Sequence, residues 1–153
     1  MITCDILTRR EIEARIVAPL LEAFAAEVGN ERALEIVQQV ILQIAREQGA
    51  LLAQQAGGCT LAHFTAVLEA WKKGDAMEME VLEQSEDRLA FNVTRCGYAD
   101  MYRQLGIAEL GKILSCGRDF ALIEGFNPEI HLTRTQTILT GAPCCDFRYE
   151  VKR

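Results

Sequence analysis

The sequence predicts an α+β fold in which N-terminal helices pack on a four-stranded antiparallel sheet. Apolar residues recur at helical spacing through residues 9–73, and the period changes to two after residue 76. Helical spacing returns over residues 98–125, and two more strand-like segments follow. The predicted order is therefore ααα–ββ–α–ββ, which fits helices packed on one face of a sheet.

Three helices are predicted in the N-terminal half of the chain. In residues 9–28 apolar side chains recur at every fourth position, and Pro19 is expected to kink or divide this helix. Glycines separate it from a second helix over residues 31–53 and a third over residues 61–73. The apolar stripe of the first helix consists of Ile12, Ile16, Leu20, Phe24 and Val28.

Four strands are predicted in the C-terminal half. Residues 77–81 and 89–93 alternate between apolar and polar side chains on either side of a Ser-Glu-Asp turn, which is typical of a hairpin. The third and fourth strands are predicted over residues 129–139 and 145–152, where β-branched residues and alternation return. Helices are predicted between the two pairs of strands, at residues 98–105, 108–116 and 119–124.

The chain is expected to form a single domain. Its 153 residues are enough for a full hydrophobic core, and neither a linker nor a repeat interrupts them. Residues 1–153 therefore divide only into a helical part, 9–73, and a sheet with a helical insertion, 76–152.

Composition and charge exclude several classes of partner. A net charge of −6 argues against nucleic acid or an anionic membrane, since both require a concentrated basic surface. No apolar run reaches the length of about 18 residues that spans a bilayer, and the first residues lack the apolar stretch of a secretion signal. We expect a cytoplasmic protein whose partner is a small molecule.

Four of the six cysteines lie between residues 96 and 145, interleaved with charged residues. Without a secretion signal, reduced thiols are favoured over disulfides. Cys96, Cys116 and Cys145 come from the ends of three predicted elements, which often converge at one rim of an α+β fold. Three interpretations stay open: small core side chains, an activated catalytic thiol, or ligands of a divalent metal ion.

Charged residues in apolar segments are the other candidates. Arg134 shares a face of its predicted strand with apolar residues, so it is expected to be partly buried and to need a carboxylate from the protein or from a ligand. Asp119 and Glu124 follow Arg118 in an apolar segment, where a buried carboxylate would have a raised pKa and could act as an acid or a base. The open alternative is that Asp119 caps a helix and Glu124 is solvated.

Several common catalytic motifs are missing from the sequence. The two histidines, His63 and His131, belong to neither a His-x-x-His nor a His-Glu-x-x-His pattern. The sequence also lacks G-x-S-x-G, a P-loop and G-x-G-x-x-G. Zinc hydrolase, serine hydrolase, NTPase and dinucleotide-binding functions are therefore not supported.

Three blocks, NVTRCGYADMYRQLG, ILSCGRDFALIEGFNP and LTRTQTILTGAPCCDFRYEV, resemble the L-2-amino-thiazoline-4-carboxylic acid hydrolase family. The N-terminal RREIEARIVAPLLEAFAAEVG is also similar, so the likeness covers nearly the whole chain. The resemblance implies hydrolytic opening of a cyclic amidine, a thiazoline carboxylate, to a carbamoyl-cysteine. The positions of this sequence that match the family's motif are Cys96, Cys116, Asp119, Arg134, Cys145 and Asp146, with Cys145 preferred to Cys144 because it directly precedes Asp-Phe.

The residues of this chain are compatible with that chemistry, and their clustering suggests a role for each. Cys116 or Cys145 is expected to attack the amidine carbon, or to hold a metal ion that activates water, and Asp119 is expected to move the proton. The residues expected to contact the substrate are Arg118, Arg134, Asp146 and Glu124. The residues considered for a metal ion are Cys96, Cys116 and Cys145.

Two other classes of function stay open beside a hydrolase of carbon–nitrogen bonds. One is a sensor module that binds a small molecule or a metal without turnover, since the architecture also resembles ligand-sensing domains related to the vinyl-reductase type. The other is a scaffold subunit whose thiols are only core and whose apolar helix face forms a homodimer.

Overall fold

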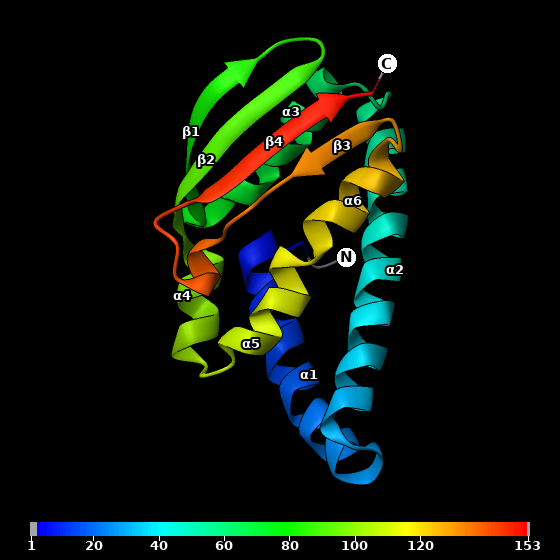
Figure 1. Cartoon of the computed structure of the whole chain (residues 1–153), viewed down its shortest axis with the longest axis vertical. Helices are drawn as coiled ribbons and strands as arrows, with labels where there is room; N and C mark the ends of the chain where they lie inside the picture. The colour runs from blue at the N-terminus through cyan, green and yellow to red at the C-terminus, as the bar shows by residue number, and fades with distance from the viewer. Residues whose placement is uncertain (1–2, 153) are drawn as a thin grey trace.

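The computed structural model describes residues 3–152 and confirms helices that cover one face of a four-stranded antiparallel sheet (Figure 1). The strands are β1 (Met77–Gln84), β2 (Arg88–Cys96), β3 (Ile130–Thr133) and β4 (Cys145–Val151), in the order β1-β2-β4-β3. The helices are α1 (Ile6–Val28), α2 (Asn30–Ala56), α3 (Leu61–Leu68), α4 (Gly97–Gln104), α5 (Ala108–Gly111) and α6 (Arg118–Phe126). Three short segments have other helical geometries: η1 (Glu69–Asp75), η2 (Lys112–Cys116) and η3 (Ile138–Thr140).

Aromatic residues of the two central strands form the core of the sheet. Phe91 of β2 lies opposite Phe147 of β4, and their rings stack with centroids 4.9 Å apart. Phe64 of α3 contacts Tyr149 of β4 and Phe126 of α6, with ring centroids 5.0 and 5.2 Å apart. The alternate residues on β4 are more polar, so the helices cover only the face that carries these rings.

The third strand is shorter than the sequence predicts. The prediction of a strand over residues 129–139 is correct only for Ile130–Thr133, and η3 follows at Ile138. The side chain of Asp146 accepts hydrogen bonds from the backbone N–H groups of Thr135 and Gln136, both at 2.9 Å. Because these N–H groups donate to a side chain rather than to a neighbouring strand, the ladder ends and the chain turns away.

Helix α1 is not divided at Pro19. It runs from Ile6 to Val28 without interruption, and Pro19 lies on its exposed side, where water can satisfy the carbonyl that the proline leaves free. The predicted apolar stripe is also exposed: Ile16 and Phe24 are 56% and 59% accessible. The buried face of α1 instead contains Arg10 and Ala14. None of the helices within residues 3–152 combines the length and apolarity required to cross a membrane.

A π-helical turn, η2, joins α5 to α6 in the stretch predicted as two ordinary helices. A π turn holds one more residue than an α-helical turn, and such turns are common at functional sites. Cys116 is the last residue of η2, and Asp119 lies in the first turn of α6. The irregular turn therefore sets the relative direction of two of the candidate residues.

Two glycines allow α2 and α6 to pack in close contact. A Cβ atom at Gly49 would lie 2.1 Å from the carbonyl oxygen of Leu122, and one at Gly125 would lie 2.0 Å from that of Arg46. No side chain fits at either position without moving a backbone. Helix α6, which carries Arg118 and Asp119, is thereby held directly against α2.

Candidate functional site

A cavity of about 550 Å³ lies between the sheet and the helices. Its walls come from the start of α1, the end of α2, α3 with η1, α6 and the core face of the sheet. The volume suits a small organic ligand. Apolar side chains make up much of the wall, including Leu51, Leu52, Val67, Trp71, Val93 and Phe147.

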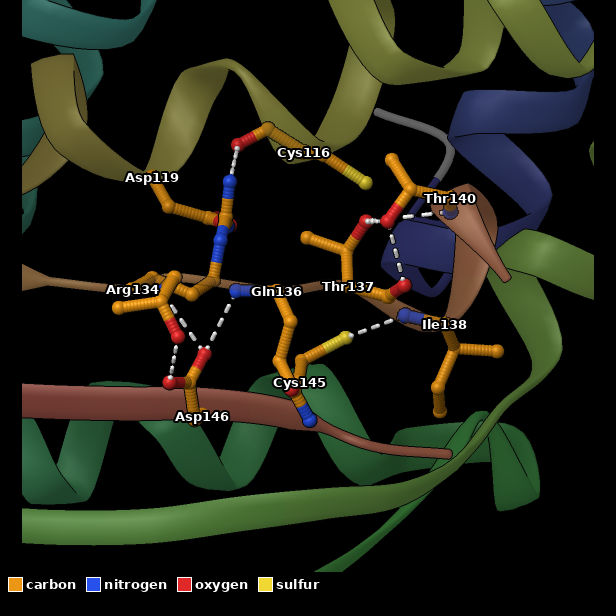
Figure 2. A network of polar contacts seen from close by, with 10 residues as sticks. Cys116, Asp119, Arg134, Gln136, Thr137, Ile138, Thr140, Cys145 and Asp146 are labelled. Carbon is orange, nitrogen blue, oxygen red and sulfur yellow. Dashed lines mark hydrogen bonds and ion pairs between the residues drawn. The ribbon is translucent and has the colours of Figure 1, made fainter. Parts of the chain in front are cut away.

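The three cysteines of the predicted site line this one cavity. The sulfur of Cys96 accepts a hydrogen bond from Ala99 N at 3.4 Å at the start of α4. The sulfur of Cys145 accepts one from Ile138 N at 3.2 Å, as Figure 2 shows. Cys116 reaches the cavity from η2. The structure therefore brings together three thiols from elements that are distant in sequence.

Burial keeps these thiols protonated. It raises the pKa of Cys116 to about 12, with the negative charge of Asp119 adding to the effect. It raises the pKa of Cys145 to about 11 and also raises the pKa of Cys96. A nucleophilic cysteine normally has a lowered pKa, so none of the three has the electrostatic environment of an activated thiolate.

Arg134 joins the irregular segment after β3 to α6 and η2 (Figure 2). Its Nη1 forms an ion pair with Asp119 Oδ2, and its Nη2 donates a hydrogen bond to the carbonyl oxygen of Cys116 at 2.8 Å. The guanidinium carbon lies 5.0 Å from the centroid of the Phe120 ring and 5.2 Å from that of Phe147. The sequence predicted a partly buried Arg134 that needs a carboxylate, and Asp119 is that carboxylate.

The pKa of Asp119 is shifted toward neutrality. Burial raises it from 3.8 to about 6, although the positive charge and the hydrogen bond of Arg134 act in the opposite direction. The side chain keeps 17% of its accessible surface and lines the cavity, so a ligand can reach it. A carboxyl group with this pKa exchanges a proton readily near neutral pH.

The cavity is rich in positive charge, although the chain as a whole carries −6. Five cationic side chains and two carboxylates belong to its lining. Such an excess favours an anionic ligand. The cationic residues are Arg9, Arg10, Lys73, Arg118 and Arg134, and the acidic ones are Asp5 and Asp119.

Arg10 and Glu13 belong to the site but are not predicted from the sequence. Arg10 is buried and donates to both carboxylate oxygens of Glu13, at 3.0 and 2.9 Å, and Arg118 approaches the same carboxylate at 3.4 Å. The sequence signal was present: Arg10 lies four residues before the buried Ala14, on the face opposite the conspicuous apolar stripe.

Two predicted substrate contacts lie outside the cavity lining. Glu124 is exposed and pairs with Arg46 of α2 at 2.8 Å, which agrees with the alternative of a solvated side chain. Asp146 holds the backbone of residues 135 and 136, and the Thr135 hydroxyl also donates to it at 2.5 Å. Its place is structural, because it fixes the segment that carries Arg134.

The arrangement of the thiols does not support the predicted metal site. Within residues 3–152, no group of three or more His, Cys, Asp or Glu side chains is placed to hold a metal ion. We therefore assign no step to a metal.

Comparisons with known proteins agree with the fold and point to one family. The sequence profile of the L-2-amino-thiazoline-4-carboxylic acid hydrolase family matches residues 9–149. No curated protein sequence matches the chain.

Two solved structures share the fold at low sequence identity. The phenol-responsive sensory domain of the transcription activator PoxR, with phenol, is 13% identical, with 90% of this chain and 73% of that one covered and a TM-score of 0.55. Trafficking protein particle complex subunit 3 from Naegleria fowleri, covalently bound to palmitic acid, is 11% identical, with 95% and 96% covered and a TM-score of 0.52.

Proposed function

Because the chain belongs to the L-2-amino-thiazoline-4-carboxylic acid hydrolase family, we propose that it hydrolyses a carbon–nitrogen bond of a small cyclic amidine carboxylate. The observation that carries the proposal is the position of Asp119: a carboxyl group with a pKa of about 6 in a cation-rich cavity of about 550 Å³. An anionic ring of this kind matches both the volume and the charge of the cavity.

In the proposed reaction, water is the nucleophile. Asp119 takes a proton from the water as its oxygen bonds to the amidine carbon. Asp119 gives this proton to the ring nitrogen, which forms a tetrahedral intermediate. It then takes the proton of the added hydroxyl and passes it to the same nitrogen as the bond between that nitrogen and the carbon breaks. One water is consumed and the product carries a carbamoyl group. The raised pKa values of Cys116 and Cys145 favour water over a thiolate.

Arg134 positions Asp119 in this mechanism. It holds the carboxylate by an ion pair and is itself held by the Cys116 carbonyl and by two aromatic rings. Its positive charge also limits how far burial raises the pKa of Asp119. The pair keeps the carboxylate oriented while leaving it able to exchange a proton.

The test is turnover of 2-amino-thiazoline-4-carboxylate by the purified protein, followed by mass spectrometry as the gain of one water. We expect the rate to rise with pH through about 6, where Asp119 loses its proton. Asp119→Asn is expected to lower the rate by about 100-fold or more, the usual contribution of a general base. Glu124→Gln, in the same helix but exposed and outside the cavity, is the matched control and should keep the wild-type rate.

The cysteine variants separate the two nucleophiles. Cys116→Ser and Cys145→Ser are expected to retain turnover if water attacks, and loss of activity in a folded Cys116→Ser protein would assign the attack to the thiol. Absence of turnover with every cyclic amidine carboxylate would reject the hydrolase.

A second candidate function is binding of a small molecule without turnover. The cavity has an extensive apolar wall, and a structure of the same fold is a phenol-responsive sensory domain. Calorimetric titration with the same amidines distinguishes the two functions, since a sensor binds them and leaves them intact.

A further inference from the structure

Two arginines on one side of the cavity share a single carboxylate. The side chains of Arg10 and Arg118 are only 9% and 5% exposed, and Glu13 lies between them. Arg10 donates hydrogen bonds to both carboxylate oxygens of Glu13, whereas Arg118 donates to only one of them, at 3.4 Å. This buried cluster therefore carries one positive charge in excess, which is costly unless an anion joins it.

The guanidinium of Arg118 is incompletely hydrogen-bonded. Its Nη1 makes two long contacts, to Glu13 at 3.4 Å and to the Leu114 carbonyl at 3.5 Å, and its buried Nε has no partner among the described residues. A buried donor without a partner costs about 1–3 kcal/mol, so such groups are usually completed by water or by a ligand. Arg118 lines the cavity, and a ligand there can supply the missing acceptor.

Unlike Arg118, Arg134 already has close partners for its guanidinium within the protein. Its guanidinium is engaged by Asp119, by the Cys116 carbonyl and by the rings of Phe120 and Phe147. A ligand carboxylate would have to displace Asp119 to bind there. Arg118 would have to give up only its long contact to Glu13, at 3.4 Å, and it precedes Asp119 directly in α6.

We infer that Arg118 and Arg10 form an anion subsite that takes the carboxylate of the ligand, and that Arg134 does not. The inference rests on the proposed function for the identity of the substrate, and it adds the orientation: the carboxylate lies toward α1 and the reacting amidine lies toward Asp119. A guanidinium matches a carboxylate with two parallel hydrogen bonds, so the subsite selects a planar anion rather than a neutral group.

The experiment compares anionic and neutral probes by calorimetry. Benzoate and its neutral analogue benzamide test the subsite with ligands that the protein is not expected to hydrolyse. A second pair compares 2-amino-thiazoline-4-carboxylate with 2-aminothiazoline, which lacks the carboxylate. Arg118→Gln is expected to weaken binding of both anions at least tenfold and to leave the neutral probes unchanged. Arg118→Lys should recover part of the affinity. Arg15→Gln, an exposed arginine paired with Glu11, is the control and should bind like wild type.

Glu13→Gln provides a second test that does not depend on removing a buried arginine. It removes the carboxylate that competes with the ligand, so anion binding is expected to become several-fold tighter. Anion binding that is unchanged or weaker in this variant, or a folded Arg118→Gln protein that binds benzoate like wild type, would overturn the subsite.

Failure of the proposed function has a different signature. In that case the wild-type protein does not hydrolyse the amidine carboxylate, while benzoate still binds in a way that depends on Arg118. Equal loss of benzoate and benzamide in Arg118→Gln would instead show that the arginine only supports the fold of the cavity, and would reject the subsite.

Discussion

At the scale of single residues, burial distinguishes the two exposed cysteines from the more buried ones of the cavity wall. Cys4 and Cys59 are exposed, whereas Cys116 and Cys145 lie in the cavity wall with pKa values raised to about 12 and 11. Raising the pKa of Cys116 from 9.0 to about 12 lowers its thiolate fraction roughly a thousandfold at neutral pH. Burial and the raised pKa therefore both lower the reactivity of Cys116 and Cys145.

This difference predicts the order of alkylation. With iodoacetamide at pH 7.5, Cys4 and Cys59 should react first, and Cys116 should react at least about 100-fold more slowly, because only the thiolate is nucleophilic. Peptide mass spectrometry over time gives the order, and the unfolded protein in denaturant, in which all six should react at similar rates, is the reference. Rapid labelling of Cys116 in the folded protein would show an activated thiol and would revive its role as the nucleophile.

Sequence reasoning identified both members of the ion pair as candidates, but it predicted neither their pairing nor the arginine cluster. Alternation around residue 134 placed an arginine among apolar neighbours, and an apolar segment around Asp119 predicted a raised pKa. Arg10 was missed because a regular apolar stripe on the other side of its helix indicated the wrong buried face. Periodicity gives a helix two faces, but it cannot tell which of two apolar faces meets the rest of the protein.

At the scale of elements, the contact between α2 and α6 fixes the position of the site. Gly49 and Gly125 let the two backbones meet, and an added Cβ at either would lie about 2 Å from a carbonyl oxygen. Helix α6 carries Asp119 and Arg118, so any displacement of the helix moves both.

Replacing Gly125 by alanine tests this contact. The variant is expected to lower the free energy of unfolding by about 3 kcal/mol or more, because the new methyl group must push the backbone of Arg46 away. Urea unfolding measures the change. Gln38→Ala, an exposed position of α2, is the control and should stay within about 0.5 kcal/mol of wild type. An unchanged midpoint for Gly125→Ala would mean that the helices can separate freely.

The elements themselves were largely predictable, and the exceptions have local causes. All four strands, and the pairing of β1 with β2 in the first hairpin, follow from the alternation of side chains and from the turn residues. The end of β3 was missed because a side chain, Asp146, takes over the hydrogen bonds of the strand. The π turn at η2 was missed because a one-residue excess leaves no mark in an apolar pattern of period 3.6.

At the scale of the whole molecule, α1 presents an apolar stripe that the other described residues leave uncovered. Five side chains along it are each at least half exposed: Ile12, Ile16, Leu20, Phe24 and Val28. Contiguous exposed apolar surface of this kind marks interaction sites. Before Pro19 the exposed arginines of α1 are Arg9 and Arg15, and the part from Pro19 onward holds only glutamates among its charged residues. A second copy packed antiparallel would therefore match opposite charges.

We accordingly predict a homodimer through α1. Phe24→Glu should convert it to a monomer, because the charge would be buried opposite Ile16 of the second copy. Light scattering after size-exclusion chromatography gives the mass. Val81→Glu, an exposed apolar position on β1, is the control and should keep the wild-type mass. A wild-type protein that is monomeric at concentrations of about 100 μM would refute the prediction.

The single extra residue of η2 has a consequence for any variant that lacks one residue in this stretch. Deleting one residue between Lys112 and Cys116 would restore a regular α-helix. The residues before the deletion would then rotate by about 100° about the helix axis relative to α6. The Cys116 carbonyl would then no longer face Arg134, although the layers around it could persist. A chain that lost this residue would thus be expected to keep the layers of the fold without the contact that holds Arg134 beside Asp119.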